Sequence, residues 1–177
     1  MKATGIVRRI DDLGRIVIPK EIRRTMRIRE GDPLEIFTDN DGGVILRKYS
    51  PIGEMTSFAV QYAEALNRAA GMAVLICDRD HVVAAAGVSR KEYGERRVTP
   101  ELEELMEYRT ARLPGDGRPF RPVEGVDRMS ELAVPIIAAG DVSGAVVMLS
   151  GDIGAGDSEV KLVQTAAGFL GRVMETG

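Results

Sequence analysis

The chain has few of the residues from which catalytic and metal sites are built. Its 177 residues include one cysteine, Cys77, and one histidine, His81. Without a second histidine or a cysteine pair, His81 is not half of a zinc site, and no Ser-His-Asp arrangement is credible. Gly115 and Gly117 are not followed by the G-K-[ST] of a phosphate-binding loop. We therefore expect no enzyme, no catalytic residues and no bound metal.

The low cysteine content also bears on the compartment. A single cysteine cannot form an intrachain disulfide, and the sequence shows neither a signal peptide nor a membrane-spanning apolar run. We expect a cytoplasmic protein with no membrane partner. Cys77 ends an apolar run beside Asp78, which favours a small buried side chain over a reactive thiol.

The basic residues are concentrated at the start of the chain. Residues 1–50 hold 11 Lys and Arg against eight Asp and Glu, a net charge of +3, whereas the rest hold 13 against 19, a net charge of −6. This asymmetry is expected when one part of a protein meets a polyanion and the other does not. Ordinary surface charge is the alternative, because a surplus of three is small.

The spacing of four of these cations predicts a helical stripe over residues 19–27. Pro19 suits the first helical position, and the i, i+3, i+4, i+7 spacing stacks the cations on one face: Lys20, Arg23, Arg24 and Arg27. Stacked like charges repel one another, and an anionic ligand would neutralise them. A solvated face screened by Glu21 and Glu30 is the alternative.

Four short β-branched runs surround this helix and predict strands at residues 5–10, 15–18, 34–37 and 44–49. Turn residues separate the runs. About 50 residues cannot bury enough surface to fold comfortably alone, so we expect a second copy to complete this part. A dimer would also give the cations the two-fold symmetry of duplex DNA.

The residues from 4 to 25, T-G-I-V-R-R-I-D-D-L-G-R-I-V-I-P-K-E-I-R-R-T, and G-D-P-L-E-I-F at 31–37 resemble the AbrB-like transition-state regulators. The resemblance implies a dimeric, all-β swapped-hairpin barrel that binds DNA. It also implies that the DNA-contacting residues are Arg8, Arg15, Arg23 and Arg24. Charge geometry alone adds Lys2, Lys20 and Arg27. No aromatics interleave with these cations, so double-stranded DNA is the expected partner rather than single strands.

The second part begins after two backbone breakers in Y-S-P-I-G at 49–53, where helical periodicity replaces the strand pattern. We predict a DNA-binding domain over 1–50, a linker over 51–55 and a further domain over 56–177. Helices are predicted over 54–70, 100–110 and 157–174. Strands are predicted at 73–77, 81–84, 132–137 and 144–149, with a loop over 112–125.

The two long predicted helices carry apolar stripes: Met55, Ala59, Tyr62, Leu66 and Ala69 on the first, and Val160, Val163, Ala167, Leu170 and Met174 on the second. Each stripe could lie on the domain's own sheet, or the two helices could build a bundle between chains. Phe58, Leu162 and Phe169 lie off the stripes and could face the sheet.

The order helix, hairpin, helix, loop, hairpin, helix, with I-I-A-A-G-D-V-S-G-A-V-V at 136–147, is similar to the GAF domain, a small-molecule sensor module. The resemblance implies an α+β domain with an antiparallel sheet, flanking helices and an unidentified small-molecule ligand. A cavity would lie between the sheet and residues 88–110. Arg90, Lys91, Arg96 and Arg97 there could form an anion-recognition lid or a solvated mixed-charge loop, so we name no cofactor and no binding residues.

The two parts in this order resemble a DNA-binding transcription regulator of sporulation genes, which activates some promoters and represses others. We expect homodimers that pair into a homotetramer. A toxin-binding antitoxin that represses its own gene is an alternative, because related swapped barrels serve in that role. A GAF-like domain that acts only as an oligomerisation scaffold is another, since few aromatics are present to stack a nucleotide or chromophore.

Overall fold

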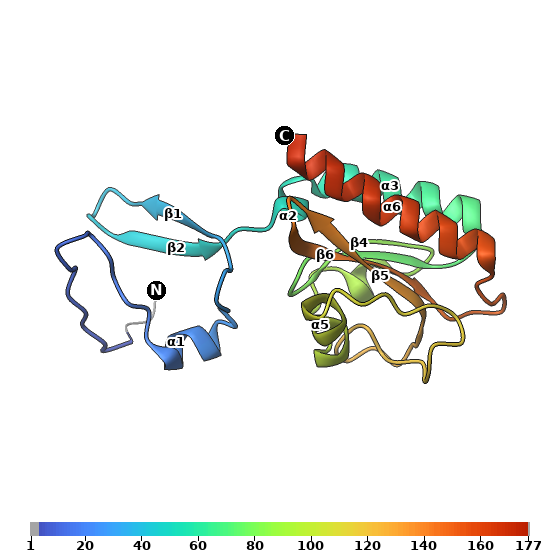
Figure 1. Cartoon of the computed structure of the whole chain (residues 1–177), viewed down its shortest axis with the longest axis horizontal. Helices are drawn as coiled ribbons and strands as arrows, with labels where there is room; N and C mark the ends of the chain where they lie inside the picture. The colour runs from blue at the N-terminus through green and yellow to red at the C-terminus, as the bar shows by residue number, and fades with distance from the viewer. Residues whose placement is uncertain (1–3, 177) are drawn as a thin grey trace. The chain divides into compact units, whose positions relative to one another are not determined.

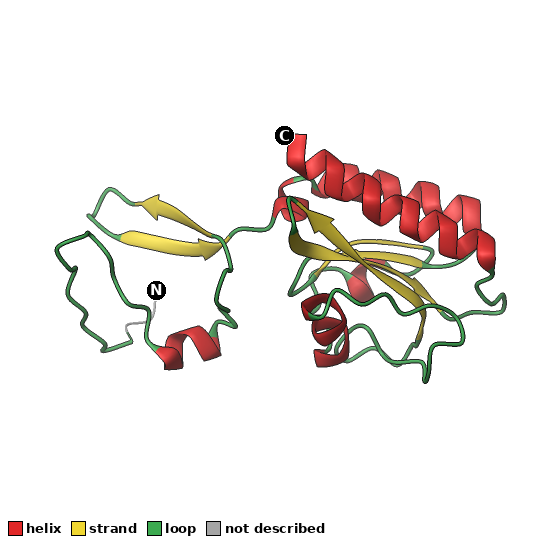
Figure 2. Cartoon of the chain, viewed as in Figure 1, coloured by secondary structure: helices red, strands yellow, loops and turns green. Residues whose placement is uncertain are grey.

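The computed structural model describes residues 4–176, and the chain divides into two compact units, Met1–Tyr49 and Ser50–Gly177. Figure 1 shows the course of the chain through both units, and Figure 2 shows their helices and strands.

The first unit contains a short helix and one hairpin. Helix α1 spans Lys20–Thr25, and strands β1, Leu34–Thr38, and β2, Val44–Lys48, pair antiparallel. Asp39 closes the hairpin turn, since its carboxylate accepts the backbone N–H groups of Asp41 and Gly43 at 3.1 and 2.6 Å. The predicted strands at 34–37 and 44–49 are confirmed.

The strands predicted at 5–10 and 15–18 are absent from the single chain that the structure describes. Over residues 4–49 the only strand pairing is between β1 and β2, and neither segment joins that hairpin. A strand exists only when a neighbour satisfies its backbone groups, and this unit offers none to these two segments. Because the two strands were predicted for a barrel completed by a second copy, they stay a prediction.

The first unit also lacks an apolar core. Among residues 4–49 only Pro19 is buried, and the other buried apolar side chains of the described chain lie in the second unit. Val7, Val17 and Ile36 are 85, 73 and 67% exposed. An exposed two-stranded hairpin is marginally stable at best in water. As a single copy, this unit therefore lacks the packing that stabilises a folded domain.

Helix α1 is shorter than the sequence predicts. It ends in two backbone hydrogen bonds, from Ile28 N to Arg23 O at 2.7 Å and from Arg27 N to Arg24 O at 3.3 Å. Arg27 adopts a left-handed conformation with φ 51°. This pattern is a Schellman C-cap, which usually contains glycine. Arg27 thus lies beyond the helix, and the predicted four-cation stripe is reduced to three.

The second unit is an α+β domain built on a four-stranded antiparallel sheet, as predicted. Its strands are β3, Val74–Cys77, β4, Val82–Ala86, β5, Ser130–Ala138, and β6, Asp141–Leu149, in the order β4-β3-β6-β5. Successive side chains alternate between two buried clusters, one on each face. The sheet is therefore covered on both sides.

Two long helices, α3, Thr56–Ala70, and α6, Asp157–Thr176, cover one face of the sheet (Figure 1). The short α4, Arg90–Tyr93, and α5, Pro100–Glu107, contribute to the cluster on the opposite face. The linker predicted at 51–55 falls within the second unit. Residues Pro51–Glu54 form α2, capped by the Ser50 hydroxyl, and Ile52 is fully buried in the core of this unit.

The long helices contact the sheet through small residues. Ala59, Ala63 and Ala166 are fully buried, which lets both helices lie close to the strands. Phe169 is 46% exposed and its ring centroid lies 5.5 Å from that of Tyr62, which also stacks on Phe58. The expectation that Phe169 faces the sheet was wrong, because this aromatic group joins α3 to α6.

Two glycines of α6 give a matched test of this packing. A Cβ on Gly171 would overlap the carbonyl oxygen of Ile137 on β5, whereas a Cβ on Gly168 would meet nothing within 4 Å. We expect Gly171→Ala to destabilise the protein by about 1–3 kcal/mol, because the helix must move off the sheet. Gly168→Ala should stabilise it by roughly 0.5–1 kcal/mol through helix propensity. Denaturation midpoints at equal protein concentration measure both, and shifts of the same sign would contradict this packing.

Candidate nucleic-acid interface

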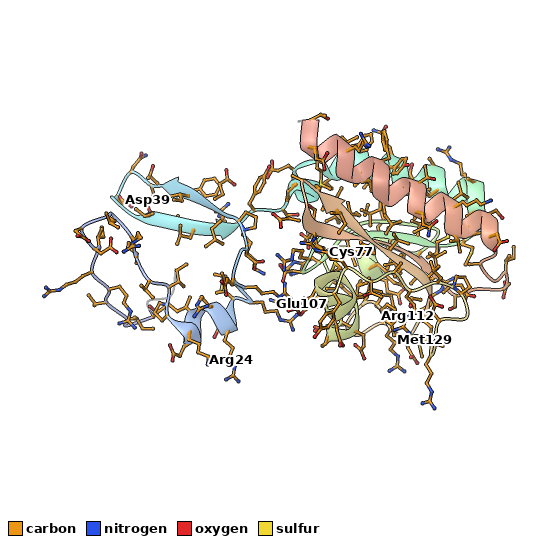
Figure 3. The ribbon with its side chains drawn as sticks, viewed as in Figure 1. Arg24, Asp39, Cys77, Glu107, Arg112 and Met129 are labelled. Atoms are coloured by element: carbon orange, nitrogen blue, oxygen red, sulfur yellow. The ribbon has the colours of Figure 1, made fainter. Side chains whose placement is uncertain are left out.

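The four arginines expected to contact DNA lie in two places in the first unit. Arg23 and Arg24 are exposed on α1, and Figure 3 shows Arg24 extending from that helix. Arg8 and Arg15 are also exposed and flank the turn at residues 11–14. Exposed guanidinium groups can bind phosphates or base edges through five N–H donors each. Their availability agrees with the expected role.

The turn between Arg8 and Arg15 is held by one carboxylate. Asp11 Oδ1 accepts the backbone N–H of Leu13 at 3.0 Å and that of Arg15 at 2.8 Å. Asp11 Oδ2 accepts Arg15 Nε–H at 2.7 Å. The backbone closes the same turn, from Asp11 N to Arg15 O at 3.0 Å, and Gly14 supplies the required positive φ of 76°.

These hydrogen bonds lower the pKa of Asp11 below its ordinary value, first through the backbone N–H of Arg15 and then through its side chain. Asp11 is therefore ionised at neutral pH, and its charge faces the Arg15 side chain. No role for Asp11 was predicted from the sequence. The signal that could have found it is an Asx-turn pattern, Asp11 followed three residues later by Gly14.

The other basic residues of the first unit differ in their positions and contacts. Lys20 is exposed on α1, Arg27 follows the helix, and Lys2 lies outside the described residues. Arg47 on β2 lies over the Phe37 ring, 4.9 Å from its centroid, a cation–π contact that was not predicted from the sequence. Phe37 pairs with Ile45, two residues before Arg47, so the two side chains lie on the same face of the hairpin.

The second unit contains no comparable chemical site among the residues described. Within residues 4–176 no group of three or more His, Cys, Asp or Glu could hold a metal ion. Over the same residues, no helix combines the length and apolar character needed to span a bilayer. Cys77 is buried, and burial and then the charge of Asp78 raise the pKa of its thiol.

The space expected to hold a small molecule is packed with side chains. Tyr93, Leu102 and Met106 of the 88–110 segment are all buried in the cluster that covers this face of the sheet. Two cations of the expected lid have partners, since Arg90 pairs with Glu64 at 2.5 Å and Arg96 donates to the backbone carbonyl of Glu92. A small hollow of about 60 Å³ lies elsewhere, under the loop at 113–119. These observations favour a mixed-charge loop over an anion lid.

Comparison with known proteins separates the same two units. A family described as "Stage V sporulation protein T C-terminal, transcription factor" matches residues 54–175, and one described as "Antidote-toxin recognition MazE, bacterial antitoxin" matches residues 7–54. The chain is 57% identical over 177 residues to stage V sporulation protein T of Bacillus subtilis (strain 168), covering 99% of both chains.

Two further similarities each concern one unit. The chain is 61% identical over 51 residues to the transition state regulatory protein AbrB of the same organism, covering 29% of this chain and 52% of that protein. The second unit resembles the GAF domain of an Acinetobacter phosphoenolpyruvate-protein phosphotransferase, with a TM-score of 0.54 and 12% identity over 69% of this chain and 82% of that one. The latter similarity shows the fold alone.

Proposed function

The chain belongs to the stage V sporulation protein T family of transcription factors, and we propose that its first unit binds double-stranded DNA through Arg8, Arg15, Arg23 and Arg24. Exposure of these four side chains on a basic unit supports the proposal. The activity takes place where the chromosome lies, in the cytoplasm. Sporulation genes are the targets, some activated and some repressed.

The missing core of the first unit supports assembly as a dimer. Twelve of the 16 large apolar side chains that are exposed in the described chain belong to this unit. In a monomer this apolar surface would be exposed to water. An exposed apolar surface of this extent is typical of a protein–protein interface. A second copy would supply partners to the segments at 5–10 and 15–18. The swapped barrel places two sets of four arginines on one DNA-binding surface.

The second unit supports a further level of assembly. The rings of Phe58, Tyr62 and Phe169 form a cluster between α3 and α6, on helices whose opposite sides pack on the sheet. Exposed aromatic surface is enriched at protein interfaces. Pairing of these helices between dimers gives a homotetramer. The packed interior of the unit favours a scaffold, and small-molecule mass spectrometry after native purification tests whether a ligand is retained.

The salt dependence of DNA binding tests the proposed contacts. Four arginines in each of two copies would neutralise about eight phosphates. The slope of the logarithm of the binding constant against the logarithm of the salt concentration should therefore be about −7. Affinity for a duplex should therefore fall by about four orders of magnitude between about 50 and 200 mM KCl. Fluorescence anisotropy measures this change. A slope shallower than about −3 would contradict phosphate contacts by all four arginines.

The antitoxin alternative keeps one supporting observation, the match of residues 7–54 to the MazE family. Against it, the second unit has a sheet covered on both faces, whereas toxin-binding regions are usually short disordered tails. A small toxin gene adjacent to this gene would favour the alternative. Co-purification of a toxin with the full chain would be the direct test.

A further inference from the structure

One guanidinium of the proposed interface is held in place by a neighbouring side chain. We propose that Asp11 is a positioning residue that presents Arg15 to a DNA phosphate. The inference rests on the proposed DNA binding. It adds to the interface a residue whose negative charge, taken alone, would weaken binding to DNA. Its basis is the set of hydrogen bonds that the Asp11 carboxylate makes within residues 11–15.

The two carboxylate oxygens of Asp11 have separate tasks. Oδ1 accepts two backbone N–H groups, from Leu13 and Arg15, and thereby fixes the path of the turn. Oδ2 accepts Nε–H of the Arg15 guanidinium at 2.7 Å. Backbone and side chain of Arg15 are thus held by the same group. These contacts restrict the rotamers of the Arg15 side chain, whose three methylene groups would otherwise leave the guanidinium mobile.

The contact at Nε leaves the distal fork of Arg15 available. No hydrogen bond from Nη1 or Nη2 of Arg15 is present among the described residues, and the side chain is 70% exposed. Phosphate oxygens are bound well by two parallel N–H groups of one guanidinium. Fixing this fork before binding reduces the rotamer freedom lost on contact, which raises affinity.

A carboxylate at a DNA-binding surface would otherwise weaken binding, because it repels phosphates. The adjacent Asp12 provides the comparison, since it is exposed and makes no side-chain hydrogen bond or ion pair within the described chain. Removing either charge changes the long-range electrostatics equally. Only Asp11→Asn also removes the carboxylate oxygen that accepts Arg15 Nε–H.

The test compares Asp11→Asn with Asp12→Asn in the full chain, with duplex DNA as the probe. Asparagine at 11 keeps an Oδ1 acceptor for the turn but places an NH₂ group where Oδ2 accepted Nε–H. We expect Asp12→Asn to leave affinity unchanged or to tighten it up to threefold, and Asp11→Asn to weaken it about five- to twentyfold. Affinities are measured by anisotropy at one salt concentration.

A double-mutant cycle shows whether the effect passes through Arg15. In an Arg15→Ala background, Asp11→Asn should no longer weaken binding and, like Asp12→Asn, should leave affinity unchanged or tighten it up to threefold. An equal loss in that background would overturn the proposal in favour of a general role in the turn. Tightening by Asp11→Asn beyond that of Asp12→Asn would overturn it too, because Asp11 would then withhold Arg15. If the unmodified chain binds no duplex, the proposed function itself fails. Steep, salt-dependent binding with equal effects of the two asparagines overturns the positioning role alone.

Discussion

Replacing Arg23 and Arg24 together by alanine is expected to lower affinity for duplex DNA at least a thousandfold. Each arginine contact with DNA contributes about 1–3 kcal/mol, and a paired first unit would lose four of them. Helix α1 should persist, because alanine has the highest helix propensity. Anisotropy titration against a duplex measures the affinity, and sedimentation velocity should show the same oligomer as the unmodified chain.

The matched control removes two positive charges from the second unit, by Arg118→Ala with Lys161→Ala. Both residues are exposed and lie outside the DNA-binding unit. The total charge falls equally, so a purely long-range effect would weaken both variants alike. We expect the control to bind within about threefold of the unmodified chain. Equal losses would show that net charge, not the α1 arginines, determines binding.

Ile16→Asp is expected to abolish both dimerisation of the first unit and DNA binding. On the single chain Ile16 is 56% exposed, and an aspartate on such a surface would change stability by about 0.5 kcal/mol or less. In the proposed paired barrel, successive side chains would alternate, so Ile16 would point away from the proposed DNA side, on which Arg15 would lie. An unpaired charge buried there costs several kcal/mol, and the barrel should not assemble.

Ile153→Asp is the control for this effect. Ile153 lies in the second unit and is 62% exposed, close to the value for Ile16, so the two substitutions are equivalent in an isolated chain. We expect Ile153→Asp to keep the oligomer and the DNA affinity of the unmodified protein. Sedimentation velocity over a range of concentrations compares the two variants. If Ile16→Asp behaves as Ile153→Asp does, the first unit does not depend on a partner copy.

The helices and strands of the second unit were predicted well from local sequence patterns, because each of them packs against other elements of the same chain. Runs of β-branched residues became β3, β4, β5 and β6, and the periodic stretches became α3 and α6. The face that each helix presents was harder to predict. The sequence does not show that Ala59 and Ala166 allow a close approach to the sheet, whereas Phe169 is too large for that contact.

In the first unit, local sequence patterns predicted less of the secondary structure. The segments at 5–10 and 15–18 have strand composition, but strand pairing depends on a neighbour that the single chain does not provide. The early end of α1 was also hidden, because Arg27 adopts a conformation that usually favours glycine. The four arginines were predicted to contact DNA from a family resemblance. Asp11 emerged only from the hydrogen bonds of the turn.

The most direct test of the central claim is amide hydrogen exchange of the full chain at residues 7–10 and 16–18. In the described single chain these backbone N–H groups donate to no other backbone group. If a second copy completes the barrel, their exchange should be slowed by at least about a thousandfold relative to unstructured peptide. Exchange within about tenfold of the unstructured rate would show that the segments remain unpaired, and would contradict the paired DNA-binding unit.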